Sequence, residues 1–303
     1  MSDNQMPDFI IIGAAKSGTT SLYYYLLQHP QIYLPENKEP FFFSFEGKDL
    51  SSYHYEGSMR AASNAITNLS QYQRLFSSAP PAVKKGEAST IYLYEKSTAE
   101  RIHHHTPGVR LIAILRNPVE RAYSHFQNFR RDGLEPLKDF AQAVKHEPTR
   151  TQENWFPTYY YIDTGFYARQ LTNYLKFFNK SQIKLFLYED LQQIDGLLSE
   201  TCSFIGVDPT FHFNTSARFN ISGKIRFPWL YKSLKNARAL KNLLRKNLSP
   251  RIWGAFKNTY DKVIMAGNEP IGLEIKNQLI EVYREDILNL QDLTGRDLST
   301  WLK

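Results

Sequence analysis

The sequence predicts an α/β protein, a P-loop-like three-layer fold in which a central parallel β-sheet is flanked by helices. Two observations support this prediction. Apolar runs of strand length recur along the 303-residue chain, and segments with the apolar spacing of amphipathic helices separate them. The first run also ends at a glycine-bounded turn that leads into a helix. Because strands that alternate with helices favour a parallel sheet covered on both faces, one domain over residues 1–303 is the simplest account.

The individual elements follow from the apolar pattern in chain order. Apolar runs predict strands at residues 9–12, 83–89, 109–115 and 183–188. Apolar spacing predicts helices at residues 20–28, 119–131, 166–178, 197–205 and 271–290. Pro30 ends the first helix, and Pro118 takes the first-turn position that proline favours in the second. Residues 31–45 are predicted to form an aromatic loop.

The composition bounds the class of protein and its compartment. Apolar residues make up 42% of the chain and charged residues 22%, which is enough for a substantial core. No run reaches the roughly 18 apolar residues that a membrane span needs, and the N-terminus lacks the pattern of a secretory signal. The single cysteine, Cys202, excludes an intrachain disulfide and is typical of a reducing compartment. We therefore expect a cytoplasmic protein without a transmembrane segment.

The net charge of +7 is concentrated in one basic segment. No acid lies between Asp208 and Asp261, whereas eleven lysines and arginines do. Such a segment favours an anionic partner, and peripheral contact of residues 224–257 with an acidic membrane surface is one interpretation. Near residues 230–246, the alternative is an ordinary helix with leucines on the core and bases in solvent. The oligomeric state is not predicted.

The segment DFIIIGAAKSGTT, residues 8–20, combines a strand, a tight turn and a helix N-terminus. Backbone N–H groups and the helix dipole make such a turn a cradle for anions. A Walker A loop reads G-x-x-x-x-G-K-[ST]. Gly13 and Gly18 keep this frame, but Thr19 takes the lysine position and the lysine stands at position 16. The loop predicts a phosphate site without the lysine that reaches the outer phosphates of a nucleoside triphosphate.

A second phosphate motif is predicted at residues 111–127, LIAILRNPVERAYSHFQ. A buried strand runs into Arg116, and the helix that follows carries Ser124. Open α/β sheets bind ligands at the carboxyl ends of their strands, and a guanidinium group suits phosphate. Arg116 alone could equally be a structural arginine at a helix start. Beside the loop at Gly13, a phosphate-binding role is favoured.

These two segments resemble the sulfotransferase superfamily that uses 3′-phosphoadenosine 5′-phosphosulfate (PAPS). AAKSGTTSL resembles its 5′-phosphosulfate loop, and LRNPVERAYSHF resembles its 3′-phosphate motif. KEPFFF is similar to the segment that bears the catalytic glutamate in heparan-sulfate-type sulfotransferases. Further segments similar to the bacterial and carbohydrate branch are GEASTIYLY, GFYARQLTNYLKFF, LFLYEDL and LTGRDLSTW. The resemblance implies PAPS as cofactor, 3′,5′-bisphosphoadenosine (PAP) as product, and no required metal.

The resemblance also implies a role for each residue of the site. Lys16 would neutralise the bridging region of the phosphosulfate, while Arg116 and Ser124 would bind the 3′-phosphate. Glu39 is the implied general base that takes a proton from the acceptor hydroxyl or amine. Lys38, also expected in the catalytic site, would orient the donor or pair with that acid. The 5′-phosphate would be held by the backbone N–H groups of Ser17, Gly18, Thr19 and Thr20.

Several residues keep alternative roles at this level. Histidine is the rival base, with His54 and His125 as candidates, although His125 follows Ser124 on the helix and a packing role is favoured for it. Glu87 is expected to line the acceptor pocket or to hold a nearby arginine. The three histidines at 103–105 cannot converge from one helix, so they predict a solvated helix end rather than a metal site.

The nucleotide lid and the acceptor site are the least determined parts. The lid is assigned to Ser222, Gly223, Lys224 and Arg226. It departs from the heparan-type branch, whose lid loop is pinned by a disulfide that one cysteine cannot form. The aromatic residues at 33–45, with Trp155 and Tyr159 to Tyr161, would suit stacking on a sugar or an apolar chain, or else form core. Neither the acceptor nor the choice between O- and N-sulfation is predicted.

Two other functions compete with sulfuryl transfer. A nucleotide-dependent small-molecule kinase would use Glu189 and Asp190 as a Walker B acid after a strand, but Thr19 replaces its lysine. A non-catalytic module that binds a nucleotide or nucleic acid would use the basic segment, which carries no recognisable nucleic-acid motif. We therefore expect no nucleic-acid partner. The sequence favours in-line transfer of a sulfuryl group from PAPS to a hydroxyl or amine of a small molecule, lipid or carbohydrate.

Overall fold

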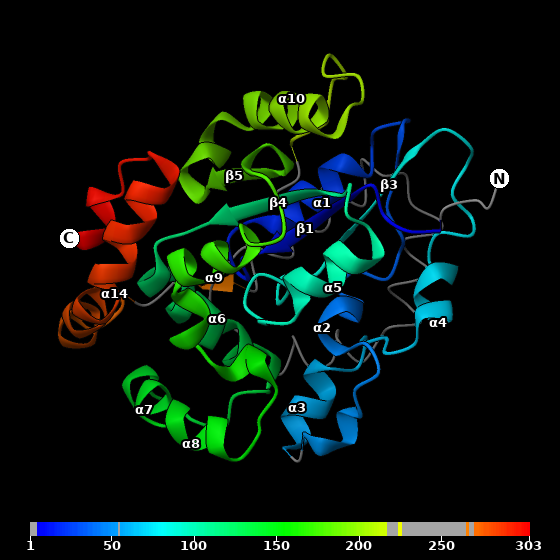
Figure 1. The fold of residues 1–303 in the computed structure, drawn as a ribbon. Coiled ribbons are helices and arrows are strands. Elements are labelled where there is room, and N and C mark those ends of the chain that lie inside the picture. The colour runs from blue at the N-terminus through cyan, green and yellow to red at the C-terminus, as the bar shows by residue number, and fades with distance from the viewer. Residues whose placement is uncertain (1–4, 54, 217–223, 226–264, 267–269) are drawn as a thin grey trace.

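The computed structural model describes residues 5–53, 55–216, 224–225, 265–266 and 270–303. Its centre is a five-stranded parallel sheet in the order β2-β3-β1-β4-β5 (Figure 1). The strands are β1 (Phe9–Gly13), β2 (Ile32–Tyr33), β3 (Lys84–Ala88), β4 (Arg110–Leu115) and β5 (Ile183–Leu187). The predicted fold class is confirmed, and all four predicted strands are present. Two residues of β2 are too few to give an apolar run, and β2 was not predicted.

The strand β1 occupies the middle of the sheet, and every one of its residues is buried. It pairs with β3 on one side, where Phe9 lies opposite Gly86, and with β4 on the other. A Cβ atom at Gly86 would stand 2.2 Å from the Phe9 ring, so the strand pair requires a glycine there. A continuous apolar run such as β1 is typical of a parallel strand covered on both faces.

Alternate residues of the sheet enter two separate hydrophobic clusters, one on each face. Phe9 and Ile11 point into the first cluster, and Ile10 and Ile12 point into the second. Figure 1 shows α10 on one side of the sheet and α6 and α9 on the other. The first face is covered by α1 (Thr19–Leu26) and α10 (Ile194–Ile205). The second is covered by α5 (Thr98–His105), α6 (Pro118–Asp132), α9 (Tyr167–Tyr174) and α14 (Leu273–Thr294).

Shorter elements complete the described chain. Five helices have only four to six residues each: α2 (Phe42–Phe45), α3 (Glu56–Ala61), α4 (Leu69–Arg74), α7 (Phe140–Lys145) and α8 (Glu147–Gln152). A separate antiparallel pair joins β6 (Lys224–Ile225) to β7 (Met265–Ala266). Among the described helices, none has the length and apolar character that crossing a bilayer requires.

The aromatic segment at residues 31–45 is not a plain loop, because it contains β2 and α2. Its phenylalanines Phe41, Phe42, Phe43 and Phe45 are at most 4% exposed and pack in the cluster on the second face. Of the two interpretations of this segment, core packing therefore describes these rings, although Phe41 also lines the cavity described below. Their burial fixes the backbone on which Glu39 stands.

Candidate active site

The loop from Gly13 to Gly18 joins β1 to α1 in a tight turn. Lys16 has a φ of 67° and Gly18 a φ of 92°, both in the left-handed region. A Cβ atom at Gly18 would also stand 2.4 Å from Leu191 Cδ1, so this position requires glycine for two reasons. The N–H of Ala14 donates to Ile114 O of β4 at 2.8 Å, which anchors the start of the turn to the sheet.

The helix α1 begins directly after this turn with an open N-terminus. No side chain caps the helix at Gly18, and no acid lies in the first turn. The first intrahelical bonds run from Ser21 and Leu22 to Gly18 O. The N–H groups of the first turn and the positive end of the helix dipole are thus directed at the space beyond the turn. This is the arrangement that binds phosphate at helix N-termini.

A cavity of about 900 Å³ lies at the carboxyl edge of the sheet, in front of α1. Among the described residues, those predicted for the cofactor site or as the base that line it are Lys16, Gly18, Thr19, Thr20, Glu39, Arg116 and His125. The structure therefore brings the two phosphate motifs and the predicted base to one site. Ser17 is fully buried beneath the turn, and neither its side chain nor Lys38 belongs to the described wall.

Lys16 presents an ammonium group whose charge is unusually easy to lose. Its Nζ donates to Asn128 Oδ1 at 3.3 Å. Burial, followed by the positive charge of Arg131, lowers the pKa of Lys16 from 10.5 to about 8, and Asp132 partly opposes this shift. The lysine thus stays mainly protonated at neutral pH and is close to its titration. Asn128 was not predicted, although its position three residues after His125 places both on one face of α6.

Arg116 stands between β4 and α6 and connects the two phosphate motifs. Its Nη1 donates to Lys16 O at 3.4 Å, and its Nη2 and Nε donate to Glu120 Oε2 at 3.0 and 3.3 Å. The guanidinium also lies 4.5 Å from the centre of the Tyr188 ring. Asn117 begins α6 by accepting the N–H groups of its first turn. These contacts hold Arg116 beside the loop and at the wall of the cavity.

The positions of Ser124 and His125 relative to the cavity differ from those that the sequence predicted. Ser124 is buried in α6 and is not part of the described cavity wall, whereas His125 is. The centre of the His125 ring lies 4.7 Å from that of Phe129 and 5.6 Å from that of Tyr161, which agrees with the packing role favoured for it. The same residue also lines the cavity, so packing is not its only contact. Burial, followed by the charges of Arg121 and Lys16, holds the pKa of His125 well below its usual range. A neutral imidazole at the wall keeps His125 open as the rival base.

Glu39 lines the same cavity. Its Oε1 accepts hydrogen bonds from Lys38 Nζ at 2.9 Å and from Thr90 Oγ1 at 3.0 Å. The side chain is 26% exposed, and its φ of 62° places it in the left-handed region. Lys38 thus pairs with the acid, as one of its two predicted roles required. Thr90 was missed, although it follows β3 at the sheet edge where ligands bind.

Neither role expected of Glu87 describes its position. Its carboxyl group is completely buried and is absent from the described cavity wall. It accepts hydrogen bonds from Tyr72 Oη at 3.0 Å and Ser89 Oγ at 2.9 Å, not from an arginine of the described chain. Burial raises the pKa of Glu87 to about 7, against the opposing effect of its hydrogen bonds. Because β3 leads both to this buried position and to the edge of the cavity, the sequence could not show which of the two Glu87 occupies.

The acids that a kinase would need are bound to other side chains, although Glu189 also lines the cavity. Glu189 Oε1 accepts the indole N–H of Trp301 at 3.2 Å, and Asp190 Oδ1 pairs with Arg296 at 2.7 Å. Within the described ranges, no group of three or more His, Cys, Asp or Glu residues is arranged to hold a metal. The histidines at 103–105 end α5, where His105 pairs with Glu46 at 2.8 Å.

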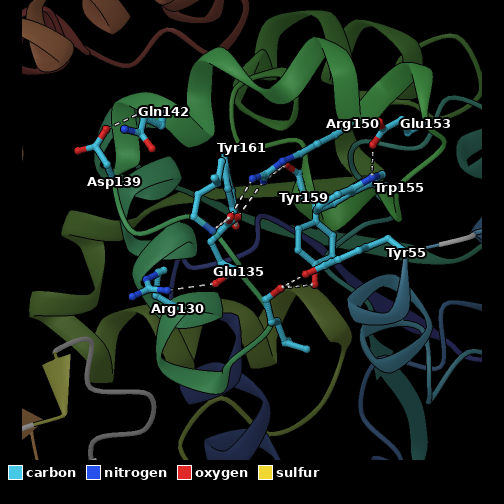
Figure 2. A network of polar contacts seen from close by, with 12 residues as sticks. Tyr55, Arg130, Glu135, Asp139, Gln142, Arg150, Glu153, Trp155, Tyr159 and Tyr161 are labelled. Carbon is cyan, nitrogen blue, oxygen red and sulfur yellow. Dashed lines mark hydrogen bonds and ion pairs between the residues drawn. The ribbon is translucent and has the colours of Figure 1, made fainter.

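A buried polar network supports the cavity wall beyond α6 (Figure 2). Glu135 and Arg150 form a two-pronged ion pair with both contacts at 2.8 Å, and their side chains are at most 1% exposed. Tyr161 donates to Glu135 Oε2 at 2.7 Å. The hydroxyl groups of Tyr55 and Tyr159 both donate to the backbone carbonyl of Leu134, which lines the cavity.

The aromatic residues of this network are structural. The guanidinium of Arg150 lies 4.9 Å from the Trp155 ring, 5.8 Å from Tyr159 and 5.4 Å from Tyr161. The Trp155 ring stacks on Tyr55 at 3.7 Å. These rings thus enclose the Glu135–Arg150 pair, and the alternative in which they stack on an acceptor does not describe them.

The predicted lid and several alternatives lie outside the described residues. Ser222, Gly223 and Arg226 belong to this group, as does His54. Lys224 is described only as backbone in β6. The basic segment from residue 226 to residue 257, including the helix predicted near 230–246, is also outside the described chain. Their assigned roles therefore stay predictions.

Comparison with known proteins agrees with the site. A family model described as "Sulfotransferase family" matches residues 7–210, which include the loop, Glu39 and Arg116. The chain belongs to this sulfotransferase family. In structure it is similar to a sulfotransferase from Alicyclobacillus acidocaldarius, with a TM-score of 0.75, 28% identity, and coverage of 98% of this chain and 99% of that one.

Two curated relatives are similar over part of their length. The membrane-associated sulfotransferase kil1 of Dictyostelium discoideum is 34% identical over 146 residues, which cover 47% of this chain and 28% of kil1. The human bifunctional heparan sulfate N-deacetylase/N-sulfotransferase 3 is 25% identical over 225 residues, covering 72% of this chain and 24% of that protein. The chain thus matches about a quarter of the length of these curated relatives.

Proposed function

We propose that the protein transfers a sulfuryl group from PAPS to an acceptor hydroxyl or amine. The observation that supports this most is the convergence of Lys16, Arg116 and Glu39 on one cavity in front of an uncapped helix N-terminus. Two cations and a helix N-terminus are suited to a donor with phosphate groups, and a carboxylate is suited to the proton of an acceptor. Membership of the sulfotransferase family supports the same reaction.

The residues present fit PAPS as the donor. The N–H groups from Ser17 to Thr20, at the end of the loop and the start of α1, would hold the 5′-phosphate, and Arg116 would hold the 3′-phosphate. Ser124 is buried and lies outside the described cavity wall, so its contact with the 3′-phosphate stays a prediction from the resemblance. When bound, PAPS supplies an activated sulfuryl group on a phosphate leaving group. The open first turn of α1 and the positive charge at Lys16 match that anionic group, and this scheme needs no metal. The lid of Ser222, Gly223, Lys224 and Arg226 belongs to the same proposal.

Each catalytic residue has one task in this scheme. The Lys16 ammonium stabilises negative charge as it develops on the departing phosphate oxygen. Glu39 takes the proton from the attacking hydroxyl or amine. Lys38 and Thr90 both bind Oε1 of Glu39, which leaves Oε2 for the acceptor. Transfer then proceeds by in-line displacement.

The acceptor class and the compartment are also proposals. Relatives named for heparan sulfate make a carbohydrate the first acceptor to test, followed by lipids and small molecules. Cys202 is buried and unpaired, which suits the cytoplasm. Contact of the basic segment with an acidic membrane surface belongs to the same set of proposals.

The proposed base is tested by the variant Glu39→Ala. We incubate ³⁵S-labelled PAPS with cell extract and with carbohydrate, lipid and small-molecule fractions, and measure the label transferred. Loss of the base is expected to reduce turnover by about 10²- to 10⁴-fold while PAP affinity stays within about twofold. Full activity of Glu39→Ala would contradict the assignment, and His125 would then become the candidate to test.

A further inference from the structure

The backbone around Glu39 is held in an unusual shape. Glu39 and Phe41 have φ values of 62° and 55°, so two nearby L-residues occupy the left-handed region. Such conformations cost free energy and persist only where the surrounding structure enforces them. The direction in which the Glu39 carboxylate points therefore depends on what holds this bend.

A chain of hydrogen bonds leads from the bend to Glu87. The N–H of Glu39 donates to Ala88 O at 2.9 Å. The N–H of Phe41 donates to Ser89 Oγ at 3.1 Å, and Ser89 Oγ donates in turn to Glu87 Oε2 at 2.9 Å. The Ser89 hydroxyl thus uses both its acceptor and its donor capacity to connect the bend to a buried carboxyl group.

The next two residues of the bend are tied to the same place. The Phe42 ring stacks on Tyr72 at 4.4 Å, and Tyr72 Oη donates to Glu87 Oε1 at 3.0 Å. The N–H of Phe43 donates to Tyr92 Oη at 3.3 Å. The hydroxyl of Tyr92 is also a hydrogen-bond partner of Glu87. Glu87 therefore accepts from three hydroxyl groups. Those of Ser89 and Tyr92 also accept backbone N–H groups of the segment, whereas Tyr72 contacts the segment through its ring.

Stability alone does not explain why a glutamate occupies position 87. It is fully buried, and no cation of the described chain pairs with it. Burying a carboxyl group without a cation is unfavourable, and an apolar residue of similar size would avoid this. The two oxygens of a carboxyl group, however, are well suited to accept hydrogen bonds from several hydroxyl groups at once.

We propose that Glu87 and Ser89 are positioning residues that set the bend at residues 39–41 and so direct the Glu39 carboxylate into the cavity. The inference rests on the proposed function, in which Glu39 takes the acceptor proton. Neither residue lines the described cavity wall. Each acts through the backbone of the segment that carries the base.

The test uses Ser89→Ala, with Ser44→Ala as the matched control. Ser44 lies in the same segment, is equally buried, and bonds Thr98 Oγ1 at 2.9 Å, away from Glu87. Amide hydrogen exchange of the segment is measured by mass spectrometry. We expect exchange at the Phe41 amide to accelerate about tenfold in Ser89→Ala and to be unchanged in Ser44→Ala. Glu87→Gln keeps the shape of the side chain and should act in the same direction if Ser89→Ala folds poorly.

The kinetic arm is a double-mutant cycle with Glu39→Gln. Transfer from ³⁵S-labelled PAPS to glucosamine, which offers both an amine and hydroxyl groups, is the readout. Ser89→Ala should reduce kcat several-fold without changing PAP affinity, and it should have no further effect in the Glu39→Gln background. An equal loss in both backgrounds, or unchanged exchange at Phe41, would overturn the inference. If the wild type neither binds PAP nor transfers label, the proposed function fails while the exchange result still decides the role of Glu87 and Ser89.

Discussion

At the scale of single residues, Lys16 combines a constrained backbone with an unfavourable electrostatic setting. Its φ of 67° lies in a region that glycine favours, and its ammonium group is partly removed from water beside Arg131 and Arg116. A lysine in the Walker A position would not meet these constraints, because that position is Thr19, already inside α1. The same surroundings that make the charged form of Lys16 unfavourable also place that charge next to the loop and the N-terminus of α1.

The first prediction concerns the pH dependence of transfer. Because burial lowers the pKa of Lys16 to about 8, the charged form decreases as pH rises through that value. We expect kcat/KM, which reports on the free enzyme, to fall above about pH 8. In Lys16→Arg the guanidinium keeps its charge, so the alkaline fall should disappear even if the rate is lower. A wild-type profile that stays flat to high pH would contradict this role.

At the scale of elements, the parts of the fold with strong local signals were predicted and those with weak signals were not. The strands β1 and β4 are long apolar runs, and α6 starts at Asn117 and Pro118, which are recognisable in the sequence. The short helices between residues 42 and 74 depend on tertiary contacts instead of their own pattern. Short elements of this kind lack the two or three turns over which helical spacing becomes visible.

The residues of the site also divide into those with a strong local sequence signal and those without one. Lys16 and Arg116 could be found because each sits in a local motif at the end of a strand. The hydrogen bond between Glu39 and Thr90 joins residues far apart in the sequence, and the Glu135–Arg150 pair joins the connection after α6 to α8. Contacts of this kind follow from the packing of the whole chain, so no local sequence pattern predicts them.

The second prediction concerns that ion pair as the support of the cavity wall. Arg150→Met leaves the buried Glu135 carboxylate without its cation, and removing one partner of a buried pair costs about 3–5 kcal/mol. We expect the free energy of unfolding in urea to fall by about that amount. The control is Arg169→Met, which breaks an exposed pair with Asp163 and should cost less than about 1 kcal/mol. Equal losses in both variants would show that burial of the Glu135–Arg150 pair is not what matters.

At the scale of the whole molecule, the third prediction concerns stability against pH. Burial raises the pKa of both Glu87 and Glu147 to about 7, above the ordinary 4.5. Between these values the two carboxyl groups bind more protons in the folded protein than in the unfolded chain, so their contribution to the free energy of unfolding should decrease as pH rises from 4.5 to 7. The lowered pKa of His125 contributes in the opposite direction, so the effect of Glu87 is read from the difference between wild type and variant. Glu87→Gln should make this decrease smaller, as measured by urea unfolding at pH 5 and pH 7.5. A decrease that is the same in wild type and Glu87→Gln would contradict the raised pKa of Glu87.

At the centre of the account is our proposal that the loop from Gly13 to Gly18 binds PAPS and not a nucleoside triphosphate. Calorimetric titration of the wild type with PAP, and separately with ATP and Mg²⁺, tests this claim most directly. We expect micromolar binding of PAP, weakened in Arg116→Ala, and no response to ATP with Mg²⁺. Binding of ATP with Mg²⁺ in the absence of any PAP response would contradict it.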